Sequence, residues 1–293
     1  MMLNLSDLID RESLPQEQEI SLDLLMDFYE QYLCTRVFLF TLEDDTEVKI
    51  IFTDGSEIFH LLGANHIYAG TPMTGKRFAN GVRDGSITLA TLRKVNAKAY
   101  RDYLNRICSL ACIDAVLKKS EYLWFKDGRI QGSSIEVKYL LLKNIDQKSL
   151  HLGIDRRHED KPYFAKTLLV TEGSSRNKFI DLASACFKVK RLQIRDKVSD
   201  AVIEDIQREK ARFVAAEQVR IYARAYFEQN QENLTRAERE IKTELKHYIE
   251  KNMDALREVI AKQDPYWTKK IAAEAVRQYL KEDAKEDIRV YKR

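Results

Sequence analysis

Two histidines that flank a glycine are the first candidates for chemistry: His60, Gly63 and His66. An imidazole titrates near neutral pH, so a histidine can act as a general acid or a general base. Six residues of an unbroken helix turn through about 240°, so both rings face one side only if Gly63 breaks the helix. The alternative for His60 is a buried histidine that is hydrogen-bonded to the backbone.

Arginine and serine side chains elsewhere could contact a phosphate group. Arg106 lies in a helical pattern, and its planar guanidinium group matches two phosphate oxygens. The alternative is a surface arginine, either solvated or ion-paired. Ser174, Ser175 and Arg176 follow a strand pattern and offer hydroxyl groups, backbone N–H groups and a cation, although the same residues also suit a plain turn. Glu172, just before them, could supply a carboxylate base.

Two lysines alternate with apolar residues over the segment 187–194, FKVKRLQI. In a strand, Lys188 and Lys190 share one face with Leu192. The pattern therefore predicts either the wall of a basic groove or a solvated strand face.

The segment 69–85 is rich in glycine and contains Lys76 and Arg77. Long loops of this composition are uncommon in compact domains unless they bind a partner or are disordered. Gly70, Gly75 and Lys76 match the spacing of a phosphate-binding loop. However, an arginine replaces the expected Ser or Thr, and no buried parallel strand leads into the segment, so we expect no nucleotide site.

Cys108 and Cys112 are four residues apart in a helical pattern, which is a permitted spacing for metal ligands. No further Cys or His lies nearby at a ligand spacing, and buried free cysteines are common. We therefore expect no metal ion and no cofactor.

The elements that must position these residues alternate between helix and strand patterns. Ser21 precedes an amphipathic stretch and is a typical N-cap. We predict helices over 22–33, 59–68 and 96–119, the second of them broken or ended near Gly63. We predict strands over 34–42, 47–52, 121–125, 135–142, 150–154, 163–170 and 187–194. This order predicts an α+β fold in which an antiparallel sheet has helices packed on one face.

The 293 residues carry 49 Lys and Arg against 46 Asp and Glu, a formal net charge of +3. This balance excludes a polycation that coats nucleic acid through bulk charge. No apolar run approaches the ~20 residues of a membrane span, and the acidic N-terminus is unlike a secretory signal. We expect a soluble cytoplasmic protein without membrane contact.

The composition changes near residue 200. All ten glycines precede residue 174, whereas the segment 201–293 has one proline and many charges of both signs. We expect an N-terminal extension over 1–20, a domain over 21–198 and a helical domain or arm over 199–293. We expect three amphipathic helices in this arm: one of about 25 residues that begins near Val202, one over 234–260 and one that opens at Asp264 and Pro265. Their apolar stripes must be buried against a partner, a second copy of the chain, each other or the first domain.

Three segments in order resemble one family of proteins. They are EVKIIFTDGSEIFHLLGANHIY (47–68), YLNRICSLACIDAVL (103–117) and SLHLGIDRRHEDKPYFAKTLLVTEGSS (149–175). The set resembles phage and mobile-element nucleases of the barnase–EndoU–colicin–RelE-like group, also called the BECR fold, over roughly residues 21–197. The ending TEGSSRNKF departs from the Ser-aromatic-aromatic ending of that group.

The resemblance implies a metal-independent RNA endonuclease, a toxin or effector, that cleaves through the 2′-hydroxyl group of its substrate. It implies RNA, such as tRNA, as the partner. The helical region lies outside the resemblance, and our hypothesis is that it binds an antitoxin or a second copy of the chain. The catalytic candidates are then His60, Arg106, Ser174 and Arg176. The RNA-binding candidates are His66, Lys76, Arg77, Ser175, Lys188 and Lys190. The alternative is a catalytically inactive nucleic-acid-binding or scaffold protein that keeps the fold.

Overall fold

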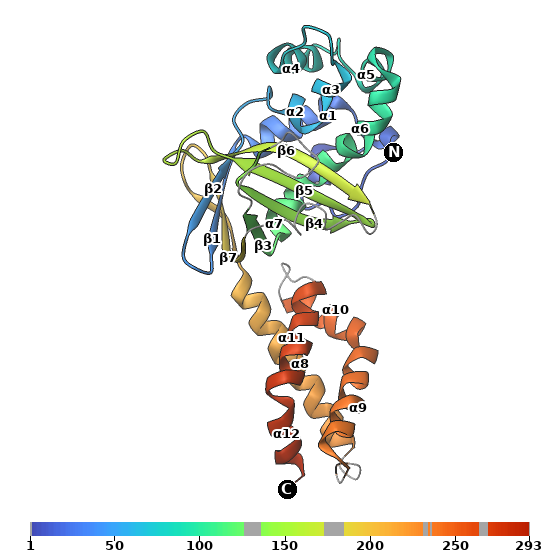
Figure 1. Ribbon diagram of the computed structural model, residues 1–293, viewed down its shortest axis with the longest axis vertical. Helices are drawn as coiled ribbons and strands as arrows, with labels where there is room; N and C mark the ends of the chain where they lie inside the picture. Colours follow the sequence, from blue (N-terminus) through green and yellow to red (C-terminus); the bar gives the residue numbers. More distant parts are fainter. Residues whose placement is uncertain are drawn as a thin grey trace. The chain divides into compact units, whose positions relative to one another are not determined.

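The computed structural model describes residues 2–125, 136–172, 185–230, 234, 236–263 and 269–292. The chain divides into two compact units, Met1–Ile206 and Gln207–Arg293. The first unit combines helices with a sheet, and the second unit is helical (Figure 1). The predicted α+β class is therefore confirmed, while the domain boundary expected at residue 198 stays a prediction.

The sheet of the first unit closes on itself. Its described strands are β1 (Arg36–Leu42), β2 (Glu47–Ile51), β3 (Tyr122–Phe125), β4 (Tyr139–Ile145), β5 (Lys148–Asp155), β6 (Tyr163–Glu172), β7 (Ala185–Asp196) and β8 (Val202–Gln207). They follow the order β1-β2-β6-β5-β4-β3-β7-β8, and β1 also pairs with β7. Seven strands therefore form a closed ring, with β8 added outside the ring beside β7. Closure leaves none of these seven strands at an edge.

The predicted antiparallel sheet with helices on one face is wrong in two respects. The sheet is closed, and β2 pairs with β6 in parallel, with Ile50 opposite Tyr163. A parallel pair requires a long crossover connection. The helices that follow β2 supply this connection, and the hairpins β1–β2, β4–β5 and β5–β6 are antiparallel, as short turns require.

Most helices of the first unit lie between β2 and β3. The described helices are α1 (Leu22–Asp27), α2 (Ile58–Leu61), α3 (Ala64–Ile67), α4 (Gly75–Arg83), α5 (Leu89–Val95), α6 (Ala97–Ser109) and α7 (Ile113–Lys119), with shorter turns η1 (Leu5–Leu8), η2 (Glu17–Glu19) and η4 (Leu110–Cys112) and a π-helical turn η3 (Phe28–Leu33). The predicted cap is confirmed, because Ser21 Oγ accepts a hydrogen bond of 3.0 Å from the N–H of Leu24. Figure 1 shows α1 to α6 gathered on one side of the sheet, with α2 and α6 packed on β6.

The glycine-rich segment 69–85 contains a helix where a loop was predicted. Thr74 caps α4 by accepting a hydrogen bond from the N–H of Arg77. A Cβ atom on Gly75 would come within 2.4 Å of the carbonyl oxygen of Ser56, and one on Gly81 within 2.6 Å of the Ile87 side chain. Glycine at these two positions lets α4 pack closely against its neighbours. The glycine content of the segment alone does not reveal this role.

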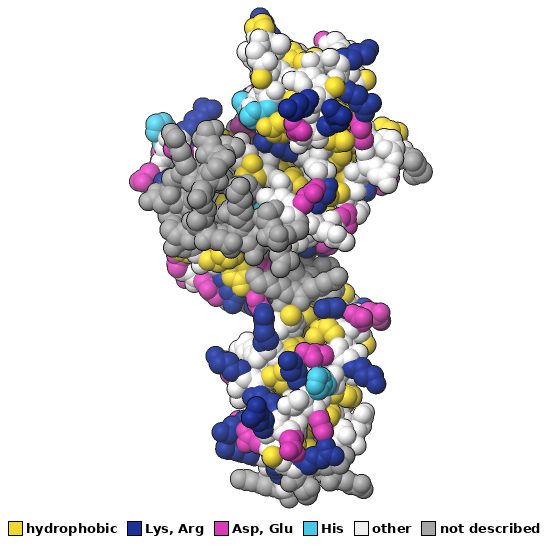
Figure 2. Space-filling view, turned by 45° about the vertical axis from the view of Figure 1, so that its right-hand side comes forward, with side chains coloured by type: hydrophobic (Ala, Val, Ile, Leu, Met, Phe, Trp, Pro, Cys, Tyr) yellow, Lys and Arg dark blue, Asp and Glu magenta, His cyan; other side chains and the backbone are white. Residues whose placement is uncertain are grey.

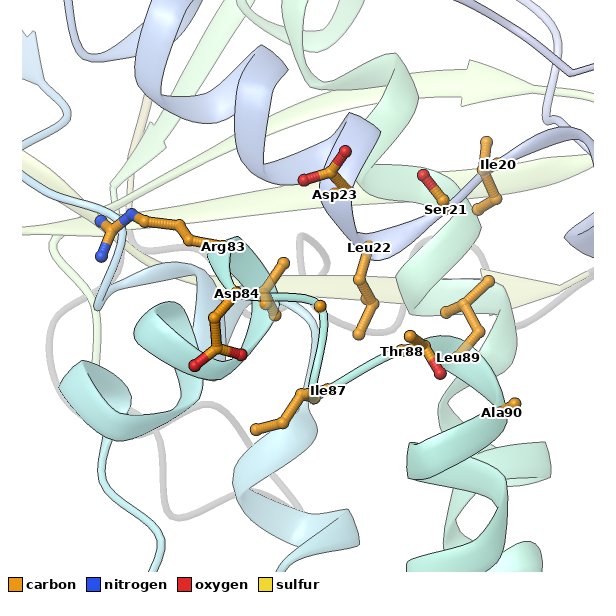
Figure 3. A pocket seen from close by; sticks show the side chains of 12 residues that line it. Ile20, Ser21, Leu22, Asp23, Arg83, Asp84, Ile87, Thr88, Leu89 and Ala90 are labelled. Atoms are coloured by element: carbon orange, nitrogen blue, oxygen red, sulfur yellow. The ribbon is translucent and has the colours of Figure 1, made fainter.

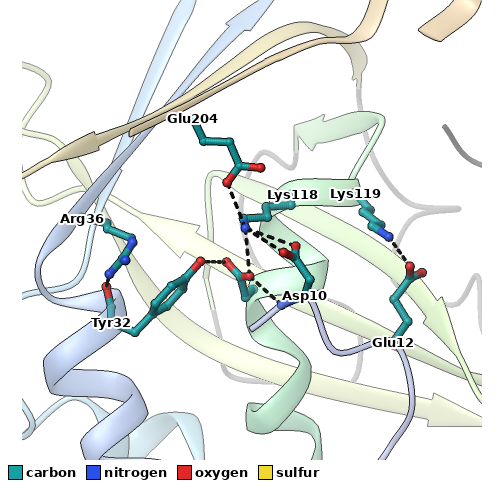
Figure 4. A network of polar contacts seen from close by, with 8 residues as sticks. Asp10, Glu12, Tyr32, Arg36, Lys118, Lys119 and Glu204 are labelled. Atoms are coloured by element: carbon teal, nitrogen blue, oxygen red, sulfur yellow. Dashed lines mark hydrogen bonds and ion pairs between the residues drawn. The ribbon is translucent and has the colours of Figure 1, made fainter. Parts of the chain in front are cut away.

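Lys118 forms an ion cluster, the Lys118 cluster, with Asp10, Asp114, Glu204 and Tyr32. Figure 4 shows Lys118 between Asp10 and Glu204. The Nζ atom of Lys118 lies 3.1 Å from Asp10, 3.3 Å from Asp114 and 2.9 Å from Glu204. The hydroxyl of Tyr32 donates a hydrogen bond of 3.0 Å to Asp114. Lys118 is 3% exposed and Asp114 is fully buried. The cluster therefore ties the N-terminal segment and β8 to α7.

The second unit is a bundle with its own apolar core. Its described helices are α8 (Arg208–Gln229), α9 (Glu238–Lys251), α10 (Met253–Gln263), α11 (Lys269–Glu282) and α12 (Ala284–Tyr291). Val219, Phe227, Leu245, Ile260 and Ile271 belong to one buried cluster, so the apolar stripes pack on each other. On the face in Figure 2, basic and acidic side chains intermingle over this unit.

Two details of the second part of the sequence differ from the prediction. Residues 202–207 form β8 rather than the start of a helix, because β-branched Val202 and Ile203 favour a strand that β7 can pair with. The helix expected over 234–260 is interrupted at Asn252. Among the described residues, no helix has both the length and the apolar character needed to cross a membrane.

Candidate functional site

Gly63 separates the two histidines into different short helices, as predicted. It has φ = 73°, a left-handed conformation that favours glycine, and it stands between α2 with His60 and α3 with His66. A Cβ atom at this position would lie 2.3 Å from the Tyr103 ring. Both histidines are exposed, so the alternative of a buried His60 is wrong.

Arg106 on α6 is buried beneath His60, with 9% of its surface exposed. Its Nε donates a hydrogen bond of 2.7 Å to the carbonyl of Leu61. Its Nη2 donates to the carbonyl of His60 and, over 3.1 Å, to Oγ1 of Thr167 on β6. Arg106 therefore fixes α2 against the sheet, and the alternative of a surface arginine is wrong.

The ring of His66 stacks on Tyr103 of α6. The ring centroids are 4.8 Å apart and the planes differ by 5°. The guanidinium carbon of Arg106 lies 6.0 Å from the centroid of the same tyrosine ring. We call His60, His66, Tyr103 and Arg106 the histidine cluster.

The surroundings of the histidine cluster favour neutral imidazoles. Although both rings are exposed, nearby protein atoms displace part of the water around them. This desolvation and the positive charge of Arg106 lower the pKa of His60 below its ordinary value of 6.5, while Glu57 opposes the shift. Desolvation, Arg106 and His60 lower the pKa of His66 as well. Burial lowers the pKa of Arg106 to about 10, so this side chain stays cationic at neutral pH. Both rings can therefore accept a proton at neutral pH.

A cavity of about 280 Å³ adjoins the histidine cluster. It lies between α6 and β6 and shares Tyr103 and Arg106 with the cluster. Glu172, the candidate carboxylate base, lines it and pairs with Lys148 over 3.4 Å. The full lining is Asp102, Tyr103, Asn105, Arg106, Leu168, Leu169, Val170 and Glu172.

Lys76 and Arg77 are exposed at the start of α4. This helix packs on α2, because the rings of Phe59 and Phe78 lie 5.2 Å apart. Arg77 donates a hydrogen bond of 3.1 Å to the carbonyl of Pro72. The two cations thus stand on a helix next to the one that carries His60.

Lys188 and Lys190 lie on β7, whose neighbours are β1, β3 and β8 rather than β6. Lys188 pairs with Glu43 over 3.2 Å, and Lys190 pairs with Asp45 over 3.0 Å. The prediction that both share a face with Leu192 is wrong, because the register with β1 shifts between Val189 and Arg191. This bulge reverses the alternation, so Leu192 is buried while the lysines are partly exposed.

Ser174, Ser175 and Arg176 lie outside the described residues.

The sequence analysis did not identify two members of the site, Tyr103 and Thr167. Tyr103 precedes Arg106 by three residues, which places both on one helix face. Thr167 interrupts the apolar pattern of β6, and this polar residue was the available signal for a buried hydrogen-bonding partner.

A second cavity, of about 530 Å³, lies between the start of α1 and the α4–α5 connection (Figure 3). Figure 3 shows Asp23, Arg83 and Asp84 at its rim among apolar side chains. None of the predicted site residues lines it.

Within the described parts of the chain, no three His, Cys, Asp or Glu side chains group in a way that could hold a metal ion.

A comparison with protein families shows which known family this chain matches. The family model described as "phage-Barnase-EndoU-ColicinE5/D-RelE like nuclease4" matches residues 25–198. No curated protein and no solved structure gives a significant match. The matched segment contains the histidine cluster and the adjoining cavity, and it confirms the resemblance drawn from the three sequence segments.

Proposed function

Because the chain belongs to the phage barnase–EndoU–colicin E5/D–RelE-like nuclease family, we propose that it is an endonuclease that cleaves RNA without a metal ion. The observation that carries the proposal is that two exposed histidines lie near one buried arginine, and that desolvation and the charge of this arginine lower the pKa of both imidazoles. Arg106 donates to the backbone of His60, and it also lies against the tyrosine on which His66 stacks. Two groups that can transfer protons are thereby held beside one cation.

The proposed reaction uses the 2′-hydroxyl group of the substrate. His60, which its lowered pKa keeps neutral, removes the proton from this hydroxyl. The 2′-oxygen forms a bond to phosphorus as the bond to the 5′-oxygen breaks, and protonated His66 gives its proton to that leaving oxygen. The products are a 2′,3′-cyclic phosphate and a 5′-hydroxyl end. The phosphate charge supports protonation of His66 in the complex.

Arg106 has a positioning role in this proposal. Its Nε and Nη2 are engaged by Leu61, His60 and Thr167, so the side chain holds the backbone under His60 in place. Its buried charge also stabilises negative charge that develops on the phosphate. The same charge disfavours a divalent cation beside the two imidazoles, which supports a metal-independent reaction.

The second candidate function is an inactive RNA-binding or scaffold protein. The engagement of Arg106 by backbone carbonyls favours this alternative, because a guanidinium group used in this way has fewer donors left for a phosphate. The two functions make different predictions for purified protein, because only the first produces cleaved RNA.

The test is incubation of the full-length protein with end-labelled tRNA and total RNA in EDTA. The nuclease proposal predicts cleavage that leaves cyclic phosphate ends, loss of cleavage in His60→Ala, and normal cleavage in His247→Ala. His247 is a matched control, because this exposed histidine lies on α9 in the second unit. RNA binding without cleavage supports the scaffold alternative, and cleavage that EDTA abolishes contradicts the metal-free mechanism.

A toxin or effector role also belongs to this proposal. Induced expression of the active protein should arrest bacterial growth, while the His60→Ala variant should not. The helical second unit is the proposed docking surface for an antitoxin or a second copy of the chain. Unchanged growth together with RNA cleavage in vitro would contradict the toxin role.

A further inference from the structure

The positive charge of the chain is concentrated in one helical segment. Between Lys76 and Arg106, eight Lys and Arg side chains stand against two carboxylates, so this segment has a formal net charge of +6. The whole chain has a net charge of +3, and its other residues are therefore net acidic. Figure 2 shows basic side chains gathered at the top of the first unit, where Figure 1 places α4, α5 and α6.

Most of these cations are available to a partner. Arg106 is buried, and Arg83 and Arg93 pair with Glu30 and Glu17. The other five are exposed, and within the described residues none of them forms an ion pair with a carboxylate. We call these five side chains the cationic layer: Lys76, Arg77, Lys94, Lys98 and Arg101.

The cationic layer borders the histidine cluster. The helix α4, which carries two of the five cations, packs on α2, which carries His60. The helices α5 and α6, which carry the other three, both pack on α3, which carries His66. Lys98 and Arg101 are three residues apart, so they are neighbours on the surface of α6. A polyanion bound along these helices therefore lies next to both imidazoles.

We propose that the cationic layer binds the phosphate backbone of a base-paired RNA stem, and that cleavage takes place in the unpaired nucleotides beside this stem. The inference rests on the proposed nuclease function. Lysine and arginine contacts to phosphates supply affinity and fix the position of the RNA without reading its bases. Cleavage is placed outside the stem, because an A-form helix holds the 2′-oxygen out of line with the bond to the 5′-oxygen.

The aromatic residues of these helices favour a stem over a single strand. Proteins bind single-stranded RNA largely by stacking its bases on aromatic rings, whereas they bind duplex RNA through its backbone. The three aromatic residues of α4 to α6 are Phe78, Tyr100 and Tyr103. Phe78 and Tyr100 are buried, and Tyr103 already stacks on His66. The cationic layer thus offers charge without a ring on which a base can stack.

The test measures binding by the full-length protein to an RNA hairpin whose riboses are all 2′-O-methylated, so that cleavage through a 2′-hydroxyl cannot occur. Fluorescence anisotropy should show that the combined variant Lys94→Gln, Lys98→Gln and Arg101→Gln binds the hairpin roughly tenfold more weakly, or weaker still, at about 0.1 M salt. The slope of log affinity against log salt should become shallower by about 3, because each lost phosphate contact contributes about 1.

A matched control removes the same charges from the second unit. The combined variant Arg277→Gln, Lys281→Gln and Lys285→Gln changes one arginine and two lysines at exposed positions of α11 and α12, and it should bind the hairpin as the wild type does. Circular dichroism checks that both variants are folded. With the wild-type protein, an unpaired 2′-O-methylated strand of the same length should bind roughly tenfold more weakly than the hairpin.

Binding and cleavage fail separately in this design. If the hairpin binds through the cationic layer but no RNA is cleaved, the surface stands and the nuclease proposal fails. The inference is overturned if RNA is cleaved while the Lys94, Lys98 and Arg101 variant binds the hairpin as tightly as the wild type. Equal affinity for the hairpin and the unpaired strand also overturns it. So does a protein that binds neither, which would leave an acidic protein as the partner of this surface.

Discussion

Replacement of Lys118 by methionine should destabilise the first unit by about 3–5 kcal/mol at neutral pH. Methionine keeps the length and the apolar stem of lysine but removes the ammonium group that three carboxylates share. Asp114 is the decisive partner, because it is fully buried and its charge is offset by the Lys118 ammonium, the Tyr32 hydroxyl and the backbone N–H of Asp10. The loss of one partner of a buried ion pair leaves the other charge uncompensated.

The pH dependence of this effect follows from the pKa of Asp114. Burial raises this pKa above its ordinary value of 3.8, and the Lys118 charge opposes the shift. Without Lys118 the pKa rises further, so the folded variant takes up a proton at a higher pH than the unfolded chain. Its stability relative to the wild type should therefore recover as the pH falls from 7 towards about 4.

Urea denaturation of the full-length protein, followed by tryptophan fluorescence and circular dichroism, measures the change. Lys119→Met is the matched control. The neighbouring Lys119 pairs with the more exposed Glu12, and this substitution should cost only ~0.2–1 kcal/mol. The double variant Lys118→Met with Asp114→Asn should regain much of the loss. The reasoning would be refuted by a Lys118→Met variant whose free energy of unfolding lies within about 1 kcal/mol of the wild-type value. A variant whose stability relative to the wild type falls further at low pH would also refute it.

Two further predictions concern the histidine cluster. The rate constant kcat/KM for RNA cleavage should fall with acidification at a midpoint below pH 6.5, because the pKa of His60 is lowered and the base must be neutral; a midpoint above 6.5 in a pH–rate profile contradicts the assignment. Gly63→Ala should lower stability by about 1–3 kcal/mol and reduce cleavage, since its Cβ meets the Tyr103 ring. Gly70→Ala is the control. Gly70 also has a positive φ, of 82°, but a Cβ atom there meets no atom within 4 Å, so this variant should keep full activity. Equal losses of activity in both variants would show that the Tyr103 contact is irrelevant.

Local features of the fold could be read from the sequence because local interactions determine them. Ser21 caps a helix through the N–H of Leu24, three residues away, and the β1–β2 turn needs only the polar residues around Asp45. The break between α2 and α3 was predictable for the same reason, since Gly63 is the only residue of that stretch without a Cβ atom.

Non-local features could not be read in the same way. Closure of the sheet depends on pairing between β1 and β7, and nothing in a single strand identifies its partner. The bulge in β7 exists only relative to β1, so strict alternation wrongly placed Leu192 on the same face as Lys188 and Lys190. The Lys118 cluster joins residues more than a hundred positions apart, such as Asp10 and Lys118.

In the candidate site, too, local features could be predicted from the sequence and non-local contacts could not. His60 and His66 could be singled out from their residue type, and Arg106 from its place in a helical pattern. The burial of Arg106 could not, because the carbonyl groups that accept its hydrogen bonds belong to α2 and no side-chain pattern marks them. Thr167 was missed because an isolated polar residue on a strand usually faces solvent, whereas this one accepts a hydrogen bond from the buried Arg106.

The most direct test of the account compares single-turnover cleavage by His60→Ala, His66→Ala and the double variant. If both imidazoles act on one phosphodiester, each single variant should lose ~10²–10⁴-fold in rate. The double variant should then be little slower than the worse single variant, because residues that act as a unit are not additive. Full activity in either single variant, or losses that multiply in the double variant, would contradict a shared site.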